Sequence, residues 1–125
     1  MDELNTIMDK LLGPNGCPWD REQTHESLCK HMLEEAQEAV DAVGTGDFAE
    51  LCEELGDVLL QVVFHAKLAE KAGRFTLDDV ITGLCGKLVR RHSHVFGGEK
   101  AVSAEDAYRI WNENKGRERE NRAKV

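Results

Sequence analysis

The side chains best suited to chemistry in this sequence are six carboxylates that occur in two groups. They are Glu34, Glu35 and Glu38, followed by Glu53, Glu54 and Asp57. In each group the first and last acids are four residues apart and the second and last are three apart, so all three share one face of an α-helix. Oxygen ligands suit hard cations such as Mg²⁺, and a cation would offset the repulsion among so many negative charges. The spacing therefore predicts a metal site.

The helices that carry these acids must face each other for the site to form. A short connection, Gly44–Asp47, separates the two groups and would fold two helices back antiparallel. The second group leads directly into Val58–Phe64, which is apolar nearly all round and predicts a central, buried helix. Acids on such a helix need partners, because an isolated buried charge is very costly. Solvated helix faces are the alternative, but the repetition of the pattern favours the metal site.

A narrow basic face follows further along the chain. Lys87, Arg91 and His94 lie at positions i, i+4 and i+7, with Arg90 beside them. In isolation these cations could simply stabilise the negative end of a helix dipole. In a chain with a net charge of −8, a local cluster of cations fits phosphate oxygens better. We interpret this face as a phosphate-binding site.

Length and composition limit the class of protein. The 125 residues provide for one domain, and a charged content of 32% with only two prolines suits a mostly helical chain. No apolar run approaches the ~18 residues of a membrane span, and the acidic N-terminus does not resemble a signal peptide. We therefore predict a soluble, cytoplasmic protein with no membrane contact. The negative net charge argues against duplex nucleic acid as a partner.

The hydrophobic periodicity and the capping residues predict an all-α fold of about five helices and no strand. The first helix spans residues 2–12, and the second begins at either Asp20 or Thr24, which are rival N-caps. The third spans residues 47–72, the fourth 76–94, and the last begins near Ser103. Residues 116–125 are charged and lack an apolar stripe, so we expect a frayed tail beyond a helical domain of residues 1–115.

Several ordered blocks of this sequence together resemble the MazG family of nucleoside triphosphate pyrophosphohydrolases. The blocks are CPWDREQTHESL, HMLEEAQEAVDAV, EELGDVLLQVVFHA, FTLDDV and KLVRRHSHVFG. They extend the resemblance from about residue 3 to Lys115. Two departures are Ser93, where the family usually has proline, and the presence of a single domain where many members have two.

The resemblance implies an all-α fold that dimerises, so that the paired acidic helices of two chains build a four-helix bundle. It implies cleavage of a nucleoside triphosphate between the α- and β-phosphates, with Mg²⁺ as the cofactor and Mn²⁺ as a substitute. The metal pattern of the family, ExxE followed by ExxD, falls on Glu35, Glu38, Glu54 and Asp57. The triphosphate contacts fall on Lys87, Arg90 and Arg91, with weaker matches at Trp111 and Lys115.

The remaining roles are less determined by the sequence. Glu53, beside a ligand position, is the candidate for positioning or deprotonating the attacking water, and Glu34 could do the same or support the ligands. Trp19, His25 and Trp111 could contact the nucleobase or serve as structural anchors. A homodimer or higher homo-oligomer is expected, because one domain supplies half a site.

Two rival functions can be weighed against this one. A di-iron bundle needs Glu-x-x-His twice on facing helices, and the pattern occurs here once, at Glu22 and His25. A catalytically silent helical module that binds nucleotide or a protein partner is the second rival. The presence of all four metal-pattern acids and the basic trio disfavours that module.

Overall fold

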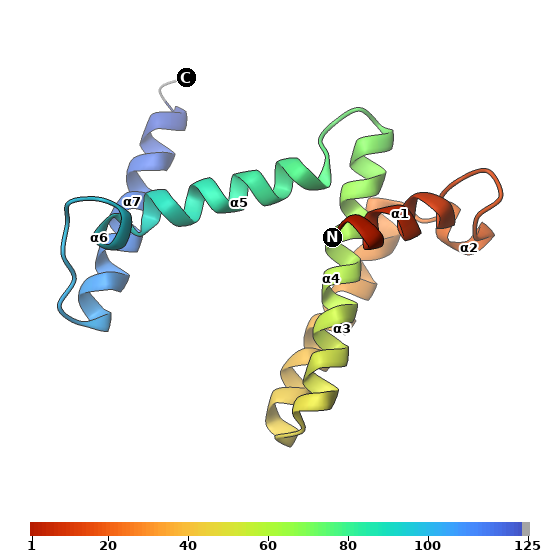
Figure 1. The fold of residues 1–125 in the computed structure, drawn as a ribbon, viewed down its shortest axis with the longest axis horizontal. Coiled ribbons are helices and arrows are strands. Elements are labelled where there is room, and N and C mark those ends of the chain that lie inside the picture. The colour runs from red at the N-terminus through yellow and green to blue at the C-terminus, as the bar shows by residue number, and fades with distance from the viewer. Residues whose placement is uncertain (124–125) are drawn as a thin grey trace. The chain divides into compact units, whose positions relative to one another are not determined.

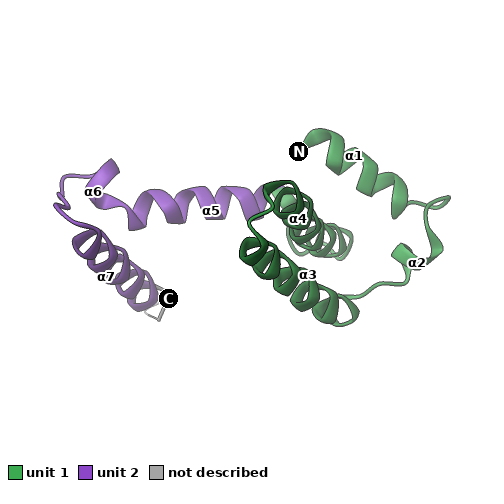
Figure 2. Cartoon of the chain, turned by 90° about the horizontal axis from the view of Figure 1, so that it is seen from below, with its two compact units in different colours: residues 1–77 green, residues 78–125 purple. Residues whose placement is uncertain are grey.

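The structure, a computed structural model, describes residues 1–123, which form α-helices and contain no strand (Figure 1). The predicted all-α fold is therefore confirmed. Two compact units make up the chain, Met1–Leu77 and Asp78–Val125 (Figure 2). None of the helices within residues 1–123 combines the length and the apolar character that crossing a membrane requires.

The first unit is built on two long neighbouring helices, α3 (His25–Thr45) and α4 (Phe48–Lys71), which run antiparallel (Figure 1). Thr24 is the N-cap of α3: its Oγ1 accepts a hydrogen bond from the Ser27 N–H, and Ser27 Oγ accepts one from the Thr24 N–H. Gly46 then ends α3 with a φ of 74°, which glycine adopts without strain. Asp47 Oδ1 caps α4 by accepting from the N–H groups of Ala49 and Glu50.

Two shorter helices complete the first unit, α1 (Asp2–Leu11) and the single-turn α2 (Pro18–Arg21). Pro18 is the first residue of α2, where its fixed φ favours a helix and its missing N–H costs nothing. Gly16 lets the preceding loop fold against the carbonyl of Leu11, because a Cβ at this position would collide with that group. Asp20, the rival N-cap, lies within α2, a helix that the sequence did not predict.

The core of the first unit lies where α1 packs against α4. Its buried side chains include Met8 from α1, Leu28 from α3, and Val63 and Phe64 from α4. Within the run Val58–Phe64, which was predicted to be buried, Gln61, Val63 and Phe64 are buried, whereas Leu59 and Leu60 are exposed. The ion pair between the buried Lys67 Nζ and Asp9 Oδ1, at 2.8 Å, fixes α1 on α4. Burial alone would lower the pKa of Lys67, but Asp9 and Glu70 outweigh it and leave that pKa raised.

The second unit consists of α5 (Leu77–Arg91) beyond its first residue, the single-turn α6 (Ser93–Phe96) and α7 (Ala104–Ala123). The predicted fourth helix ends three residues early, because His92 leaves the helical conformation. Ser93 Oγ accepts a hydrogen bond of 2.9 Å from the amide of Asn114, which is buried on α7. A proline at this position could not make that bond. Ser103 Oγ accepts from the Asp106 N–H and caps α7 as predicted.

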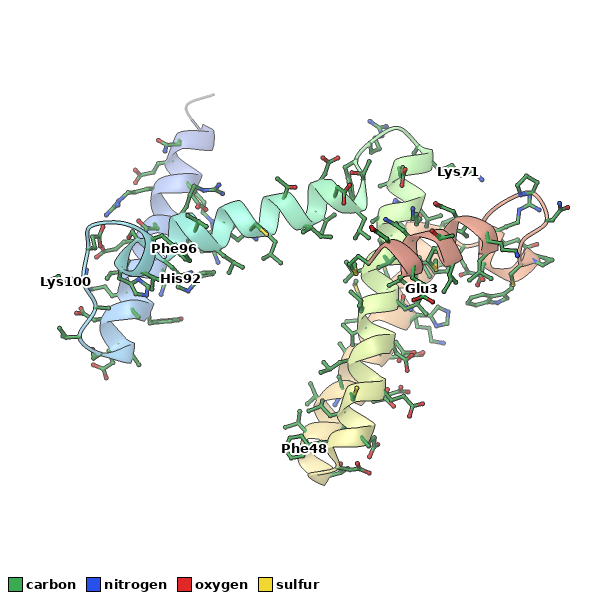
Figure 3. The ribbon with its side chains drawn as sticks, in the orientation of Figure 1. Glu3, Phe48, Lys71, His92, Phe96 and Lys100 are labelled. Carbon is green, nitrogen blue, oxygen red and sulfur yellow. The ribbon has the colours of Figure 1, made fainter. Side chains whose placement is uncertain are left out.

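Residues 116–123 of the predicted tail continue α7 as a helix, and Lys124 and Val125 lie outside the described residues. Glu118, in this stretch, forms ion pairs with Arg90 and Arg91 of α5. The tail has no apolar stripe that could pack against another helix. These ion pairs hold it against α5 instead. Phe48, at the turn between α3 and α4, is exposed (Figure 3).

Candidate metal centre

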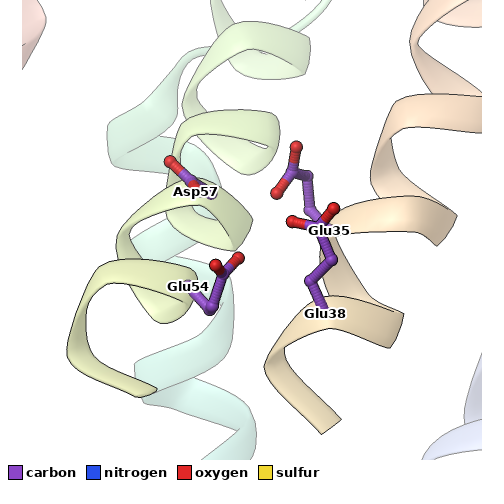
Figure 4. A group of neighbouring side chains, drawn as sticks. All are labelled: Glu35, Glu38, Glu54 and Asp57. Atoms are coloured by element: carbon purple, nitrogen blue, oxygen red, sulfur yellow. The ribbon is translucent and has the colours of Figure 1, made fainter. Parts of the chain in front are cut away.

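Four of the six predicted acids converge between α3 and α4. Each offers a carboxylate oxygen, and the four oxygens all lie within 4.8 Å of one another. The acids are Glu35, Glu38, Glu54 and Asp57. Figure 4 shows the first two reaching from α3 toward the last two on α4. We call these four residues the acid group.

The electrostatics of the acid group favour the binding of a positive charge. Glu35 Oε2 and Glu54 Oε2 are buried and have no hydrogen-bond partner among residues 1–123. Burial, together with the hydrogen bond to Glu38 and the charges of Glu38 and Asp57, raises the pKa of Glu54 to about 7. Burial and the same neighbours also raise the pKa of Glu35. An oxygen-only donor set with unpartnered buried oxygens fits a hard divalent cation.

The other two predicted acids do not join this group. Glu34 turns toward its own helix, where Lys30 Nζ lies 3.9 Å away and His31 Nδ1 lies 3.7 Å away. Glu53 is exposed and lies outside the acid group. Of the six carboxylates from which the spacing predicted a metal site, only four therefore meet. Helical spacing places three acids on a broad face, but only the side chains nearest the α3–α4 contact can meet.

Three of the predicted basic residues, Lys87, Arg90 and Arg91, lie on α5 of the second unit, whereas His94 lies on α6. The two arginines are paired. Arg90 Nε lies 2.9 Å from Glu118 Oε1, and Arg91 Nε and Nη2 each lie 3.0 Å from Glu118 Oε2. Arg91 is 7% exposed, and its guanidinium carbon lies 5.0 Å from the centre of the Trp111 ring. Lys87 is half-buried and has no ion pair within the described part of the chain.

Glu118, the acid that pairs with both arginines of this basic face, was not predicted from the sequence. It occurs in the stretch assigned to a frayed tail, so it had no predicted partner. One signal could have located it, because Glu118 follows Trp111 by seven residues and so shares its helix face. Trp111 supports the face through Arg91 and through an edge contact with His92, whose ring centre lies 5.1 Å away.

The stability that Glu118 provides should depend on pH. Hydrogen bonds from Arg90 and Arg91 hold its pKa below the ordinary value of 4.5. A carboxylate with a lowered pKa stabilises the fold above its ordinary pKa, and this stabilisation disappears as the pH falls through the lowered value. We expect Glu118→Gln to be less stable than wild type at neutral pH and to lose less stability on acidification. Thermal unfolding followed by circular dichroism over a pH series measures both effects.

The matched control for this measurement is Glu120→Gln, which removes an exposed acid from the same helix. It should keep the wild-type dependence on pH. If the two variants lose stability in parallel on acidification, Glu118 is not the group responsible.

The predicted aromatic residues lie in different surroundings. His25 is stacked on His65, with the two Nδ1 atoms 2.8 Å apart, so it is a structural partner within the first unit. Trp19 is exposed, and its ring makes an edge contact with His31, at 5.8 Å between ring centres. Trp111 and Lys115 both lie half-buried on α7.

Sequence comparison assigns this arrangement to a family. The family described as MazG nucleotide pyrophosphohydrolase domain matches residues 23–96, which contain the whole acid group and most of the basic face. The chain belongs to the MazG family. The resemblance noted in the sequence is thereby confirmed.

Curated MazG relatives cover nearly all of this chain. A nucleoside triphosphate pyrophosphohydrolase/pyrophosphatase MazG of Thermotoga maritima is 49% identical over 118 residues, which are 94% of this chain and 45% of that protein. A nucleoside triphosphate pyrophosphohydrolase of Escherichia coli K12 is 44% identical over 124 residues, which are 98% of this chain and 47% of that protein. The chain thus spans about half the length of these relatives.

A solved structure agrees with the fold. The crystal structure of a mazG-related protein from Thermotoga maritima matches 93% of this chain and 99% of its own, with a TM-score of 0.75 and 30% sequence identity. The match at this length supports the helical architecture described above for a MazG domain.

Proposed function

We propose that this chain hydrolyses nucleoside triphosphates between the α- and β-phosphates, giving nucleoside monophosphate and pyrophosphate, with Mg²⁺ as its cofactor. The observation that carries the proposal is the acid group, which presents four carboxylates between two helices in a MazG domain. The names of the curated relatives support the reaction class. Family membership and the oxygen-only donor set support a divalent metal.

In this proposal the acid group holds the cation, and Mn²⁺ could replace Mg²⁺ because it accepts the same oxygen ligands. Bound there, the metal would neutralise phosphate charge and lower the pKa of a coordinated water. Glu53 accepts the proton of the attacking water, or orients that water, through its exposed carboxylate next to Glu54.

The basic face of α5 binds the triphosphate in this proposal and stabilises charge on the departing pyrophosphate. Lys87 and Arg90 are accessible for this role, and Lys115 adds a third cation. The Glu118 carboxylate engages only the Nε of Arg90, which leaves the other N–H donors of that guanidinium available to phosphate oxygens. Arg91 is buried, so its contribution includes holding Glu118 and Trp111 in place.

We also propose that the chain functions as a homodimer or a higher homo-oligomer in which α3 and α4 of two copies form a four-helix bundle. Large apolar side chains are exposed along both helices: Leu33, Val40 and Val43 on α3, and Phe48, Leu55 and Leu59 on α4. Leu33 is 73% and Phe48 is 82% exposed. Large exposed apolar surfaces usually mark an interface, and the number of exposed apolar side chains on these two helices supports one here. Sedimentation equilibrium gives the mass in solution.

The reaction is tested by incubating the protein with a panel of ribo- and deoxynucleoside triphosphates, with and without Mg²⁺. We expect monophosphate and pyrophosphate in equal amounts, formed only when Mg²⁺ is present. Product identification by anion-exchange chromatography separates this outcome from release of diphosphate and inorganic phosphate, which would contradict the proposed cleavage position. Binding of nucleotide and metal without any product would indicate a silent binding module.

A further inference from the structure

A single carboxylate serves two adjacent arginines at the end of α5. Glu118 Oε1 accepts a hydrogen bond of 2.9 Å from Arg90 Nε, and Glu118 Oε2 lies 3.0 Å from both Nε and Nη2 of Arg91. Guanidinium groups on neighbouring residues repel each other, and a carboxylate that they share offsets this repulsion. The two arginines can therefore stay side by side in defined positions.

The two guanidinium groups differ in what they leave for a ligand. The Arg91 side chain is 8% exposed and lies over the Trp111 ring, whereas the Arg90 side chain is 60% exposed. A guanidinium has five N–H donors, and Glu118 engages only the Nε–H of Arg90. The Nη groups of Arg90 have no acceptor among residues 1–123, so they form an exposed set of donors on a side chain that is already fixed.

A glycine one turn earlier on α5 makes room for this position of Arg90. A Cβ at Gly86 would lie 3.0 Å from Arg90 Nη1, a distance that a real Cβ contact seldom reaches. The guanidinium thus lies beside the helix backbone at Gly86 while Glu118 holds its Nε. Two contacts from different helices define where its donors are.

The helix that carries Glu118 is held in place by other contacts. Asn114, buried on the same face of α7 one turn earlier, donates a hydrogen bond of 2.9 Å from Nδ2 to Ser93 Oγ of α6. Trp111, a further turn back, contacts Arg91 and His92. Loss of the Glu118 carboxylate should therefore loosen the arginines and leave α7 in place.

Charge and position act in opposite directions at Glu118. Its negative charge repels an anion, so from charge alone its removal should strengthen the binding of a triphosphate. Its contacts with the arginines favour the same ligand, because a flexible side chain that must be immobilised on binding reduces affinity. The sign of the effect of a substitution shows which of the two dominates.

We propose that Glu118 is a positioning residue for the triphosphate, which holds Arg90 so that its remaining N–H donors are ready for phosphate oxygens. The proposal rests on the proposed function, since the triphosphate is the substrate assigned there. It predicts that removing this acid weakens binding although the basic face becomes more positive.

The test is isothermal titration with inorganic triphosphate in Mg²⁺, a probe that carries the charge of the substrate and no base. Glu118→Gln should weaken binding about tenfold, because two arginines must then be immobilised by the ligand itself. The matched control is Glu120→Gln, which makes the same change in charge at an exposed position of α7 and should bind as wild type or slightly more tightly. Circular dichroism checks that each variant is folded at the temperature of the titration.

A double substitution separates positioning from a merely structural role. If Glu118 acts through Arg90, Glu118→Gln should weaken binding much less in an Arg90→Ala background than in wild type. A general loss of structure would instead lower the affinity equally in both backgrounds.

Failure of the proposed function gives a different result from failure of this proposal. If wild type binds inorganic triphosphate but releases no pyrophosphate from any nucleoside triphosphate, the proposed reaction is wrong and the titration alone decides the role of Glu118. Unchanged or tighter binding by Glu118→Gln, or an equal loss with and without Arg90, overturns the proposal. A wild type that does not bind triphosphate overturns it as well.

Discussion

Asp57→Asn should lower Mg²⁺-dependent pyrophosphate release at least ~100-fold, since even residues that merely support metal ligands change activity by 10- to 100-fold. The substitution keeps the size of the side chain but removes one negative charge from the acid group, and Glu38→Gln should act in the same way. The helical fold should persist, because these acids repel one another and weaken the fold when no metal is bound. Activity assays and far-ultraviolet circular dichroism measure the two effects.

Thermal unfolding provides the control for this prediction. Mg²⁺ should raise the Tm of wild type, because a ligand that binds only the folded state stabilises it, and should raise that of Asp57→Asn much less. In chelator, Asp57→Asn should be at least as stable as wild type. Asp41→Asn, which alters an exposed acid elsewhere on α3, should behave as wild type in every respect. Near-normal turnover in Asp57→Asn or Glu38→Gln would mean that the acid group is not the metal site.

Arg91→Ala should destabilise the second unit by about 3 kcal/mol, the lower end of the cost of removing one partner from a buried ion pair. The lower end applies because Glu118 would keep its contact with Arg90. The variant should also lower kcat/KM for the triphosphate far more than it lowers metal affinity, since the acid group belongs to the first unit. Chemical unfolding, kinetics and metal titration provide the three measurements.

Two variants separate the contributions of Arg91 to stability and to binding. Lys87→Ala removes a cation that has no ion pair within residues 1–123, so it should reduce kcat/KM without lowering Tm. Arg109→Ala removes an exposed arginine that pairs only with acids of its own helix and should change stability by less than about 1 kcal/mol. If Arg91→Ala reduces metal affinity as strongly as triphosphate use, the basic face has a structural role.

The acid group could be predicted from rules that act between residues near one another in the chain. Glu35 and Glu38 on one helix, and Glu54 and Asp57 on the next, follow from spacing, a two-residue connection and the Asp47 cap, all of which act between near neighbours in the chain. The exclusion of Glu34 does not follow from these rules. It depends on how α3 is rotated against α4, which packing decides, and on the nearby cations of its own helix.

Contacts between segments distant in the chain could not be predicted either, because they also depend on how the helices pack. The pairing of Glu118 with Arg91 links residues 27 positions apart, and it turns a tail without an apolar stripe into the end of α7. Gln61 lies in an apolar run, where its amide looked incidental until the structure showed it buried and unpartnered. The single-turn α2 and α6 are too short to produce a periodic signal.

The raised pKa of Glu54 would make metal binding to the acid group depend on pH. At a pKa of about 7, the protonated form of Glu54 is populated at neutral pH. A divalent ion can use this carboxylate as a ligand only after that proton has left for the solvent, so protons and metal compete for the same oxygens. Under the proposed function, occupancy of the acid group at a fixed Mg²⁺ concentration would therefore fall as the pH falls. In the proposed function, Mg²⁺-dependent hydrolysis would fall together with this occupancy.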